Sequence, residues 1–369
     1  MMSNDFERYS CQLALPGFTQ AIQQKLQRAK VLIAGAGGLG CPSSLYLAAS
    51  GVGTIGIADY DVISVSNLHR QVLYADDEIG LKKSVTACKK LQQQNSGIQL
   101  VPIDEKITSQ NVMEVIQPYD IVVDCTDNFE AKYLLNDACV LSGKVMVYGS
   151  IYQYEGQLAV FNLPNGDGTR SPNFRDIFPS VNAAQIPNCA EGGVMPALAG
   201  IIGCLQANEV IKYVTGQGEL LAGKIMMFDV RSLQSRIIKL KRVSETVITG
   251  LPVTESVPVI SADELKKAIG LNEYYLIDVS TPAEHNSFNI GGNNIPLNDL
   301  EKNKSLLNFD KPVVFYCATG KRSSEAVKLI KTKFPGVKTY SLEGGIKGWG
   351  RGSSHFDEGE ISPSENSTK

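Results

Sequence analysis

The sequence of 369 residues lacks any hydrophobic run long enough to cross a membrane, and residues 1–5 lack the apolar core of a secretory signal. It also lacks a basic excess, since 35 Lys and Arg against 38 Asp and Glu leave a formal charge of −3. A protein that neutralises nucleic-acid phosphates would show such an excess. None of the eight cysteines forms a C-x-x-C pair, and scattered free thiols are typical of a reducing compartment. These absences predict a cytoplasmic protein that binds no membrane and no nucleic acid.

Short β-branched runs alternate with helical patterns over the first half of the chain. The patterns predict strands at 30–34, 54–58, 98–102, 121–123 and 145–150, with helices at 39–49, 81–94, 109–116 and 131–141. This alternation indicates an α/β fold, a doubly wound and mostly parallel sheet covered on both faces. A more antiparallel part follows, with strands at 157–162, 224–228 and 235–240, a polar loop at 164–187 and a helix at 195–214.

The patterns divide the chain into two domains. Residues 1–242 hold the first α/β pattern, and residues 243–258 have the composition of a linker. A smaller α/β pattern occupies 259–350, with helices at 262–269 and 324–334 and strands at 275–278, 313–317 and 337–341. The Ser/Glu-rich tail, 351–369, has no periodicity and is expected to be disordered.

A glycine-rich turn follows the first predicted strand. Glycine at Gly35, Gly37 and Gly40 permits a tight turn, a close approach to phosphate and close packing of helix on strand. The helix N-terminus there favours phosphate, and Asp59 ends the next strand, where a carboxylate accepts from ribose hydroxyls. This motif alone predicts a nucleotide site and is equally typical of an NAD-dependent enzyme.

Side chains beyond the turn favour a triphosphate over NAD. Arg70 can bind two phosphate oxygens, and Lys83 can supply a second positive charge. Asp127 follows a strand at the carboxyl edge of the predicted sheet, where a carboxylate suits Mg²⁺. Singly, these residues could be a surface ion pair, a solvated helix residue and a helix N-cap. All three together at one edge favour nucleotide binding.

With these motifs, residues 5–240 resemble the ThiF/MoeB family (HesA/MoeB/ThiF), relatives of the ubiquitin-activating enzymes. The resemblance implies a Rossmann-like adenylation domain that acts as a homodimer. Its reaction would be MgATP-dependent adenylation of the C-terminal Gly-Gly carboxylate of a ubiquitin-like sulfur-carrier protein. It implies Asp127 as the magnesium ligand and Arg70 as a catalytic cation. The residues expected to hold ATP are Gly35, Gly37, Gly38, Gly40, Asp59, Ser66, Asn67, Leu68, His69, Arg70, Gln71, Lys83, Asp127 and Asn128.

Two departures from the family pattern change the expectations. Cys11 stands where the family has an arginine that reaches the nucleotide of the dimer partner, so we expect slower adenylation or substitution by Arg8. Most members also bind a structural zinc through two C-x-x-C pairs. Here residues 172–176 are Pro-Asn-Phe-Arg-Asp, and the second pair, expected after Leu240, is absent. We therefore predict no zinc site.

Cys317 ends an apolar strand and opens the turn Cys-Ala-Thr-Gly-Lys-Arg-Ser. Such a turn points backbone N–H groups, a helix dipole and two cations at the sulfur, which stabilises a thiolate or persulfide. A buried core thiol is the alternative, and it leaves the glycine and the cations unexplained. Residues 259–350 resemble a rhodanese domain through Asp278-Val279, Glu284, the Cys317 turn and the pattern that ends at Trp349. The departures are Ser280, where an arginine is common, and Phe288-Asn289, where Gly-His is usual.

Cys189 is a second candidate nucleophile. It lies at the end of the polar loop just before a helix, and a helix N-terminus favours the thiolate. An ordinary loop cysteine is as compatible with this position, but relatives use a cysteine here to bind the carrier covalently. The other cysteines in apolar patterns are expected in the core: Cys41, Cys88, Cys125, Cys139 and Cys204.

The two resemblances together predict an adenylyltransferase with sulfurtransferase activity. After adenylation, a Cys317 persulfide loaded by a donor such as a cysteine desulfurase would convert the carrier terminus to a thiocarboxylate, for molybdopterin or thiamin synthesis. Two alternatives stay open. The departures at Cys11 and Ser280 and the missing zinc ligands are compatible with a catalytically degenerate scaffold that binds the carrier. The glycine turn is compatible with an NAD-linked oxidoreductase fused to a redox domain.

Overall fold

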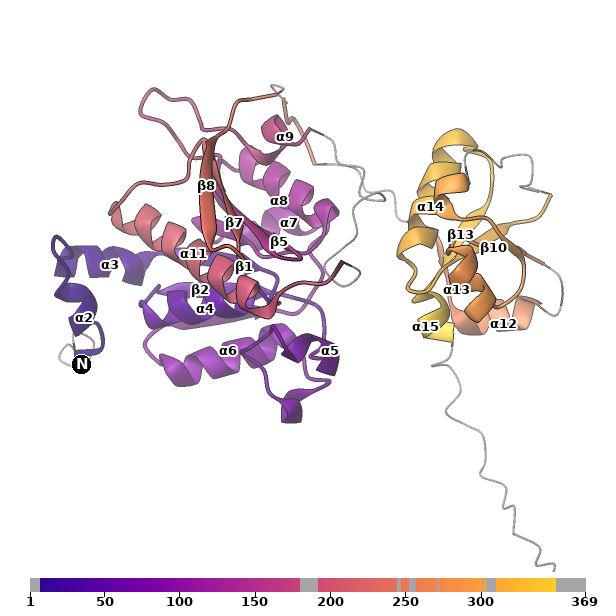
Figure 1. Cartoon of the computed structure of the whole chain (residues 1–369), viewed down its shortest axis with the longest axis horizontal. Coiled ribbons are helices and arrows are strands. Elements are labelled where there is room, and N and C mark those ends of the chain that lie inside the picture. The colour runs from indigo at the N-terminus through magenta and orange to yellow at the C-terminus, as the bar shows by residue number, and fades with distance from the viewer. Residues whose placement is uncertain are drawn as a thin grey trace, which may run out of the picture. The chain divides into compact units, whose positions relative to one another are not determined.

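The computed structural model describes residues 7–179, 192–243, 247–251, 257–269, 271, 273–300, 302 and 310–349. Cys189 and the predicted tail 351–369 lie outside these residues, as do 244–246 and 252–256 of the predicted linker. The chain forms two compact units, Met1–Val253 and Thr254–Lys369 (Figure 1). A search of the described helices finds none with the length and hydropathy of a membrane span.

The first unit is built on one eight-stranded sheet with the order β3-β2-β1-β4-β5-β6-β7-β8. The first five strands in this order pair parallel and the remaining pairs are antiparallel. The strands are β1 (Lys30–Ala34), β2 (Thr54–Ala58), β3 (Gln99–Ile103), β4 (Ile121–Asp124), β5 (Val145–Tyr152), β6 (Glu155–Phe161), β7 (Lys224–Asp229) and β8 (Gln234–Lys239). This confirms the predicted doubly wound, mostly parallel sheet.

The central strands are apolar at every position because both faces of the sheet are covered. In β1, Ile33 belongs to the core on one face and Leu32 to the core on the other. The first core is closed by α3 (Gln20–Arg28), α4 (Gly40–Ala49), α6 (Lys83–Gln94) and α11 (Pro196–Thr215). The second is closed by α7 (Val112–Ile116), α8 (Phe129–Leu141) and α9 (Phe174–Ile177) (Figure 1).

Two predictions for this unit are wrong in detail. The expected polar loop at 164–187 contains α9, because Asn173 caps the helix and Phe174 is buried. Cys204 is only partly buried on α11, whereas Cys41, Cys88, Cys125 and Cys139 are buried as predicted. The short helices α2 (Ser10–Leu13) and α5 (Val65–Leu68), the 3-10 turn η1 (Asp76–Glu78) and α3 were not among the predicted elements.

The second unit has a five-stranded parallel sheet with the order β11-β10-β12-β13-β9. Its strands are β9 (Val259–Ile260), β10 (Tyr275–Asp278), β11 (Asn293–Asn294), β12 (Val313–Tyr316) and β13 (Thr339–Leu342). Its helices are α12 (Ala262–Ile269), α13 (Pro282–Ser287), α14 (Lys321–Lys333) and α15 (Gly345–Trp349), with a 3-10 turn η3 (Leu297–Asp299). Apolar cores lie on both faces of the sheet, which confirms a second, smaller α/β unit.

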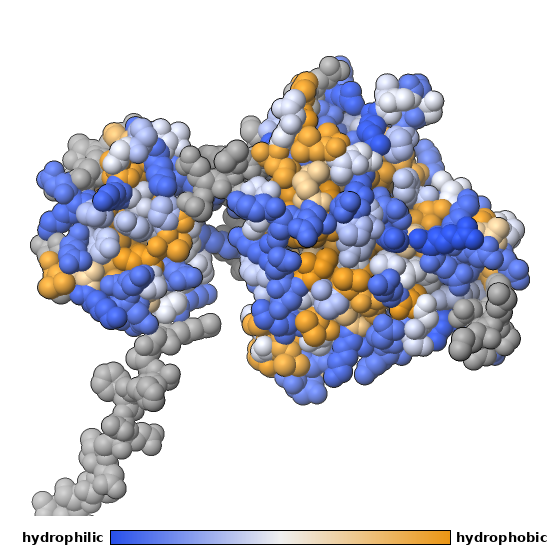
Figure 2. Space-filling model, turned by 180° about the vertical axis from the view of Figure 1, so that it is seen from behind, coloured by the Kyte–Doolittle hydropathy of each residue, from blue (hydrophilic) through white to orange (hydrophobic). Residues whose placement is uncertain are grey.

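Hydrophobic side chains are not confined to these cores. Figure 2 shows apolar patches among hydrophilic residues on one face of the larger unit. The edge strand β8 is exposed along its whole length, and Ile237 and Ile238 are 62% and 51% exposed.

Candidate nucleotide and sulfur sites

The predicted nucleotide-site residues lie at one edge of the larger sheet. Strands β1, β2 and β4 are parallel, so their carboxyl ends meet at this edge. The strand order reverses between β1 and β4, and open α/β sheets bind ligands in the crevice at such a reversal.

The glycine turn after β1 is packed too closely for side chains at two positions. Gly35 has φ +99°, and a Cβ there would lie 2.7 Å from the Cys125 carbonyl oxygen. A Cβ on Gly40 would lie 1.9 Å from the Gly35 carbonyl oxygen. The turn therefore packs on the segment after β4, and the start of α4 packs on the turn.

Asp59 is tied to this turn. Its Oδ2 accepts from the Ala36 N–H at 2.8 Å and its Oδ1 from the Asp61 N–H at 2.9 Å. Burial raises the pKa of the Asp59 carboxyl, and the nearby Lys83 ammonium opposes that shift. The carboxylate is thus oriented at the end of β2, beside the turn.

Arg70 lies over the glycine turn. A Cβ on Gly38 would be 3.5 Å from the Arg70 Cγ. The Arg70 Nη2 donates to the Asn67 Oδ1 at 2.9 Å, and its Nη1 lies 2.7 Å from the His69 Nε2. Among the described residues Arg70 forms no ion pair.

Gln71 supplies a buried and unsatisfied acceptor beside the turn. The side chain is 4% exposed, and its Oε1 has no hydrogen-bond partner among the described residues. A Cβ on Gly37 would contact its Nε2 at 3.5 Å. An orphaned buried acceptor costs about 1–3 kcal/mol, so a ligand donor at this position would recover that loss.

The two remaining residues of the predicted segment differ in exposure. Leu68 packs against the core, while Ser66 is exposed on α5.

Lys83 is a buried cation at the first residue of α6. Its side chain is 5% exposed and its Nζ lies 3.2 Å from the Asp61 Oδ2. The alternative of a solvated helix residue is therefore wrong. A cation is unfavourable at the positive end of a helix dipole, and burial adds to the cost. An anionic ligand in the crevice would offset both.

Asp127 and Asn128 follow β4 and have different surroundings. The Asn128 Oδ1 accepts from the Ala131 N–H at 2.9 Å, so Asn128 caps α8, and not Asp127 as the alternative supposed. Asp127 is exposed, accepts from the Asn128 Nδ2 at 3.3 Å and forms no described ion pair. In the described ranges no three His, Cys, Asp or Glu side chains gather as a ready metal site.

Sequence reasoning missed a buried ion pair beneath this segment. The Lys132 Nζ lies 3.0 Å from the Asp124 Oδ2 and donates to the Gly149 carbonyl oxygen at 2.9 Å. The Asp124 Oδ1 accepts from the Thr126 N–H and hydroxyl. Burial disfavours the Lys132 ammonium, but the charge and hydrogen bond of Asp124, together with Tyr148, outweigh this, so the pKa of Lys132 is raised. The pair anchors the segment that carries Asp127, and a lysine on the buried face of the predicted helix was the signal for it.

The N-terminal residues make contacts within their own chain. The Arg8 Nη1 donates to the Gln94 carbonyl oxygen at 2.9 Å, at the end of α6, and Cys11 is exposed. That Arg8 replaces the missing cation stays a prediction.

Cys317 lies at the carboxyl end of β12, in the second unit. The Gly320 N–H donates to its Sγ at 3.2 Å, and Gly320 has φ +88° as the residue before α14. A Cβ on Gly345 would lie 2.3 Å from the Cys317 carbonyl oxygen, so the loop also packs on the start of α15. The sulfur is cradled as predicted, yet Cys317 is 0% exposed and belongs to an apolar core. The loop around the sulfur and the burial of the thiol, which the sequence analysis treated as alternatives, are therefore both present.

Of the two cations that follow Cys317, Arg322 is paired with a carboxylate and Lys321 is exposed. The Arg322 guanidinium makes two 2.7 Å hydrogen bonds to the Glu284 carboxylate. These bonds lower the pKa of Glu284 to about 2. His285, for which the sequence showed no partner, has its Nδ1 2.8 Å from the Oδ2 of the fully buried Asp278.

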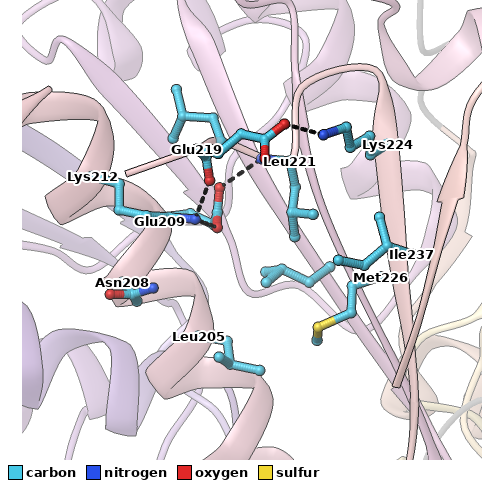
Figure 3. A pocket seen from close by; sticks show the side chains of 11 residues that line it. Leu205, Asn208, Glu209, Lys212, Glu219, Leu221, Lys224, Met226 and Ile237 are labelled. Atoms are coloured by element: carbon cyan, nitrogen blue, oxygen red, sulfur yellow. Dashed lines mark hydrogen bonds and ion pairs between the residues drawn. The ribbon is translucent and has the colours of Figure 1, made fainter. Parts of the chain in front are cut away.

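A separate pocket of about 230 Å³ lies between α11 and strands β6 to β8 (Figure 3). Its apolar wall includes Leu158, Leu205 and Met226. Its charged groups pair with one another, Glu209 with Lys212 and Glu219 with Lys224 (Figure 3). None of the predicted site residues lines it, and its paired charges offer no free group to a ligand.

The larger unit is a doubly wound α/β unit with a glycine turn and cations at one sheet edge, and the smaller unit holds a cysteine in a loop at the end of a parallel strand. Residues 9–250 match the model of the ThiF family and residues 261–351 match the rhodanese-like domain. The chain belongs to the ThiF family and carries a rhodanese-like domain in its C-terminal part.

Curated relatives span both parts. The chain is 34% identical over 384 residues to adenylyltransferase and sulfurtransferase MOCS3 of Drosophila persimilis, covering 95% of this chain and 84% of the relative. It is 36% identical over 366 residues to the probable adenylyltransferase/sulfurtransferase MoeZ of Mycobacterium tuberculosis, covering 93% and 92%. The structure of E. coli MccB is similar in fold, with TM-score 0.58 and 22% identity over 69% of this chain and 74% of that one.

Proposed function

We propose that this chain adenylates the C-terminal Gly-Gly carboxylate of a ubiquitin-like sulfur-carrier protein and then replaces the activated oxygen by sulfur. Relatives that match more than nine-tenths of the chain are named adenylyltransferase and sulfurtransferase, which supports both activities. The observation that carries the proposal is the gathering of Arg70, Gln71 and Lys83 around the glycine turn. A dinucleotide site needs no buried cation there, whereas a triphosphate does.

ATP fits the charges and the orphaned acceptor at this crevice. Arg70 and the buried Lys83 would neutralise phosphate oxygens, Asp59 would accept from ribose, and the Gln71 Oε1 would accept from the nucleotide. The residues proposed to form the rest of the site are Gly35, Gly37, Gly38, Gly40, Ser66, Asn67, Leu68, His69 and Asn128.

Asp127 is the proposed ligand of the Mg²⁺ that accompanies ATP. It is exposed at the carboxyl edge and is not paired with a described cation. Mg²⁺ prefers one or two carboxylates together with phosphate oxygens, so one free carboxylate is a suitable protein ligand. When bound, the ion would neutralise phosphate charge.

In the first step, a carboxylate oxygen of the carrier terminus attacks the α-phosphorus, and the bond from that phosphorus to pyrophosphate breaks. The chain contributes position and charge: the glycine turn holds the phosphates, and Arg70 and Lys83 stabilise the charge that develops. The products are the acyl-adenylate and pyrophosphate.

In the second step, the outer sulfur of a Cys317 persulfide attacks the acyl carbon and AMP leaves. The resulting acyl disulfide is cleaved when the Cys189 thiolate attacks the Cys317 sulfur, which releases the thiocarboxylate and leaves a Cys189–Cys317 disulfide. An external thiol then reduces that disulfide. Because Cys317 is fully covered, the loop that follows it has to move before a donor such as a cysteine desulfurase can load sulfur.

The carrier is proposed to be of the molybdopterin-synthase or thiamin type, and the enzyme to work as a homodimer. The test incubates the full chain with MgATP, a cysteine desulfurase with cysteine, and purified carriers that end in Gly-Gly. We expect carrier-dependent pyrophosphate release and a carrier mass that shows oxygen replaced by sulfur. A carrier that lacks its last glycine is the control. The proposal fails if no carrier supports pyrophosphate exchange while the protein binds NAD.

A further inference from the structure

The two segments that would bind zinc in the ThiF resemblance meet in this structure through other side chains. They are residues 172–176, around α9, and the residues after β8. Structural zinc takes thiolate and imidazole ligands, and neither occurs in 171–179 or 239–243. The residues present at this junction do not fit a zinc ion.

An ion pair joins the two segments directly. The Asp176 Oδ2 lies 3.3 Å from the Arg242 Nε, and the Asp176 side chain is 4% exposed. The Val243 N–H donates to the Asp176 carbonyl oxygen at 2.8 Å, and the Arg242 Nη2 donates to the Arg170 carbonyl oxygen at 3.0 Å. The chain leaving β8 is therefore bound to α9 by both side-chain and backbone groups.

Asn173 caps the N-terminus of α9 and also hydrogen-bonds Asp176. Its side chain accepts from the Arg175 N–H at 2.9 Å, and its own N–H and Nδ2 donate to the Asp176 Oδ2 at 3.1 and 3.0 Å. With the guanidinium of Arg242, three donors thus surround the Oδ2 of Asp176.

A second ion pair ties α9 to α8. The Arg175 Nε and Nη2 donate to the two Asp137 oxygens at 2.6 and 2.7 Å, and the Asn136 Oδ1 accepts from the Phe174 N–H at 2.7 Å. The Asp137 side chain is 4% exposed. Polar pairs of this kind are strong where the geometry is bidentate and one partner is desolvated.

An aromatic cluster surrounds Phe174, the first residue of α9. The Phe174 ring is 1% exposed, and its centroid lies 5.1 Å from that of Tyr133, 5.4 Å from Tyr148 and 5.0 Å from Phe178. Burial of the Phe174 ring therefore holds α9 in place through apolar contacts, in addition to the two ion pairs.

We propose that these groups form a metal-independent clamp, defined by Asn136, Asp137, Asn173, Arg175, Asp176 and Arg242. The clamp joins α9 to the segment after β8, the two segments that the resemblance would join through zinc, and it also ties α9 to α8. The first unit accordingly folds and stays folded without zinc.

The first test is chemical and uses the full chain. Protein produced in zinc-supplemented medium is assayed for metal, then heated with and without a strong zinc chelator while circular dichroism is followed. We expect no stoichiometric zinc and the same unfolding temperature in both samples. About one zinc per chain, or a lower unfolding temperature with chelator, would overturn the proposal.

The second test removes the half-exposed partner, so that the protein still folds. Arg242→Met should lower the unfolding temperature by roughly 2–4 °C. It should also speed hydrogen exchange in peptides over 171–178 and 239–243, but not in peptides over β2. Lys241→Met is the matched control, since it removes a neighbouring exposed cation without a described partner.

A double-mutant cycle separates the ion pair from general damage. Asp176→Asn keeps the shape of the side chain and removes its charge. If the clamp operates as proposed, Asp176→Asn and Arg242→Met together cost clearly less than the sum of the single changes. Additive losses, or equal effects of Arg242→Met and Lys241→Met, would contradict the clamp.

Discussion

The two sites differ in how their charges are satisfied. At the edge of the larger sheet, Arg70 and Asp127 have no described ion-pair partner, and Gln71 holds an orphaned acceptor. At the Cys317 loop, Arg322 is bound to Glu284 and the sulfur is covered. A site with unsatisfied groups is prepared for a charged ligand from outside. A site that satisfies its own charges has to rearrange before it reacts.

The largest expected effect comes from removing the sulfur. Cys317→Ser should abolish transfer of sulfur to the carrier and leave carrier-dependent pyrophosphate exchange within about twofold, because the nucleophile and the nucleotide site lie in different units. The assay follows carrier mass and pyrophosphate exchange on the same protein. Loss of both activities would contradict a division of labour between the two sites.

Next come the cations of the nucleotide edge. Arg70→Ala or Lys83→Met should reduce pyrophosphate exchange by roughly 100- to 1,000-fold, as expected when a donor to the developing charge is lost. Lys82→Met is the matched control, since the neighbouring Lys82 is half exposed and its Nζ pairs with Asp104 and donates to the Tyr60 carbonyl oxygen. If Lys82→Met and Lys83→Met reduced pyrophosphate exchange equally, the prediction that the buried lysine has a special role would be wrong.

Lys132→Met tests the buried pair under the Asp127 segment. It leaves the Asp124 carboxylate buried without its partner, so the free energy of unfolding should fall by roughly 3–5 kcal/mol. Urea unfolding followed by circular dichroism measures this loss. Adding Asp124→Asn should restore part of it, and a further loss instead would show that the two charges are not coupled.

The smallest effect concerns Glu284 and depends on pH. Its folded pKa is lowered to about 2, below the unfolded value of 4.5, so the pair with Arg322 stabilises the fold above about pH 4.5. That stabilisation is lost as the pH falls towards 2. The side chain is 44% exposed, so Glu284→Gln should cost no more than about 1 kcal/mol at pH 7.

The only tryptophan of the chain, Trp349, lies in the second unit and gives a local signal for this measurement. Urea midpoints from its fluorescence at pH 7, 5 and 3 should converge for the wild type and Glu284→Gln as the pH falls. Glu343→Gln, at an exposed acid of the same unit, is the control. A gap between the midpoints that is constant with pH would rule out the ion pair as its cause.

The strands and their site residues were predictable because their signals are local. The apolar runs of β1, β2 and β10 and the turn around Gly35 follow from adjacent residues, and the structure places them as the patterns predict. The helix α9 was missed because it has only four residues, which is too few to show a helical pattern of apolar positions. The rings of Tyr133 and Tyr148 that pack against Phe174 come from distant segments.

The chain's own sequence was sufficient to determine the two α/β patterns, the glycine turn and the cysteine loop, since each depends on the conformational preferences of residues that are neighbours along the chain. Tertiary structure alone decided which charges are paired. Lys132 meets Asp124, Arg242 meets Asp176 and His285 meets Asp278 only once strands and helices are packed. Burial, which decides whether Lys83 or Cys317 is open to solvent, is likewise a property of that packing and not of any single segment.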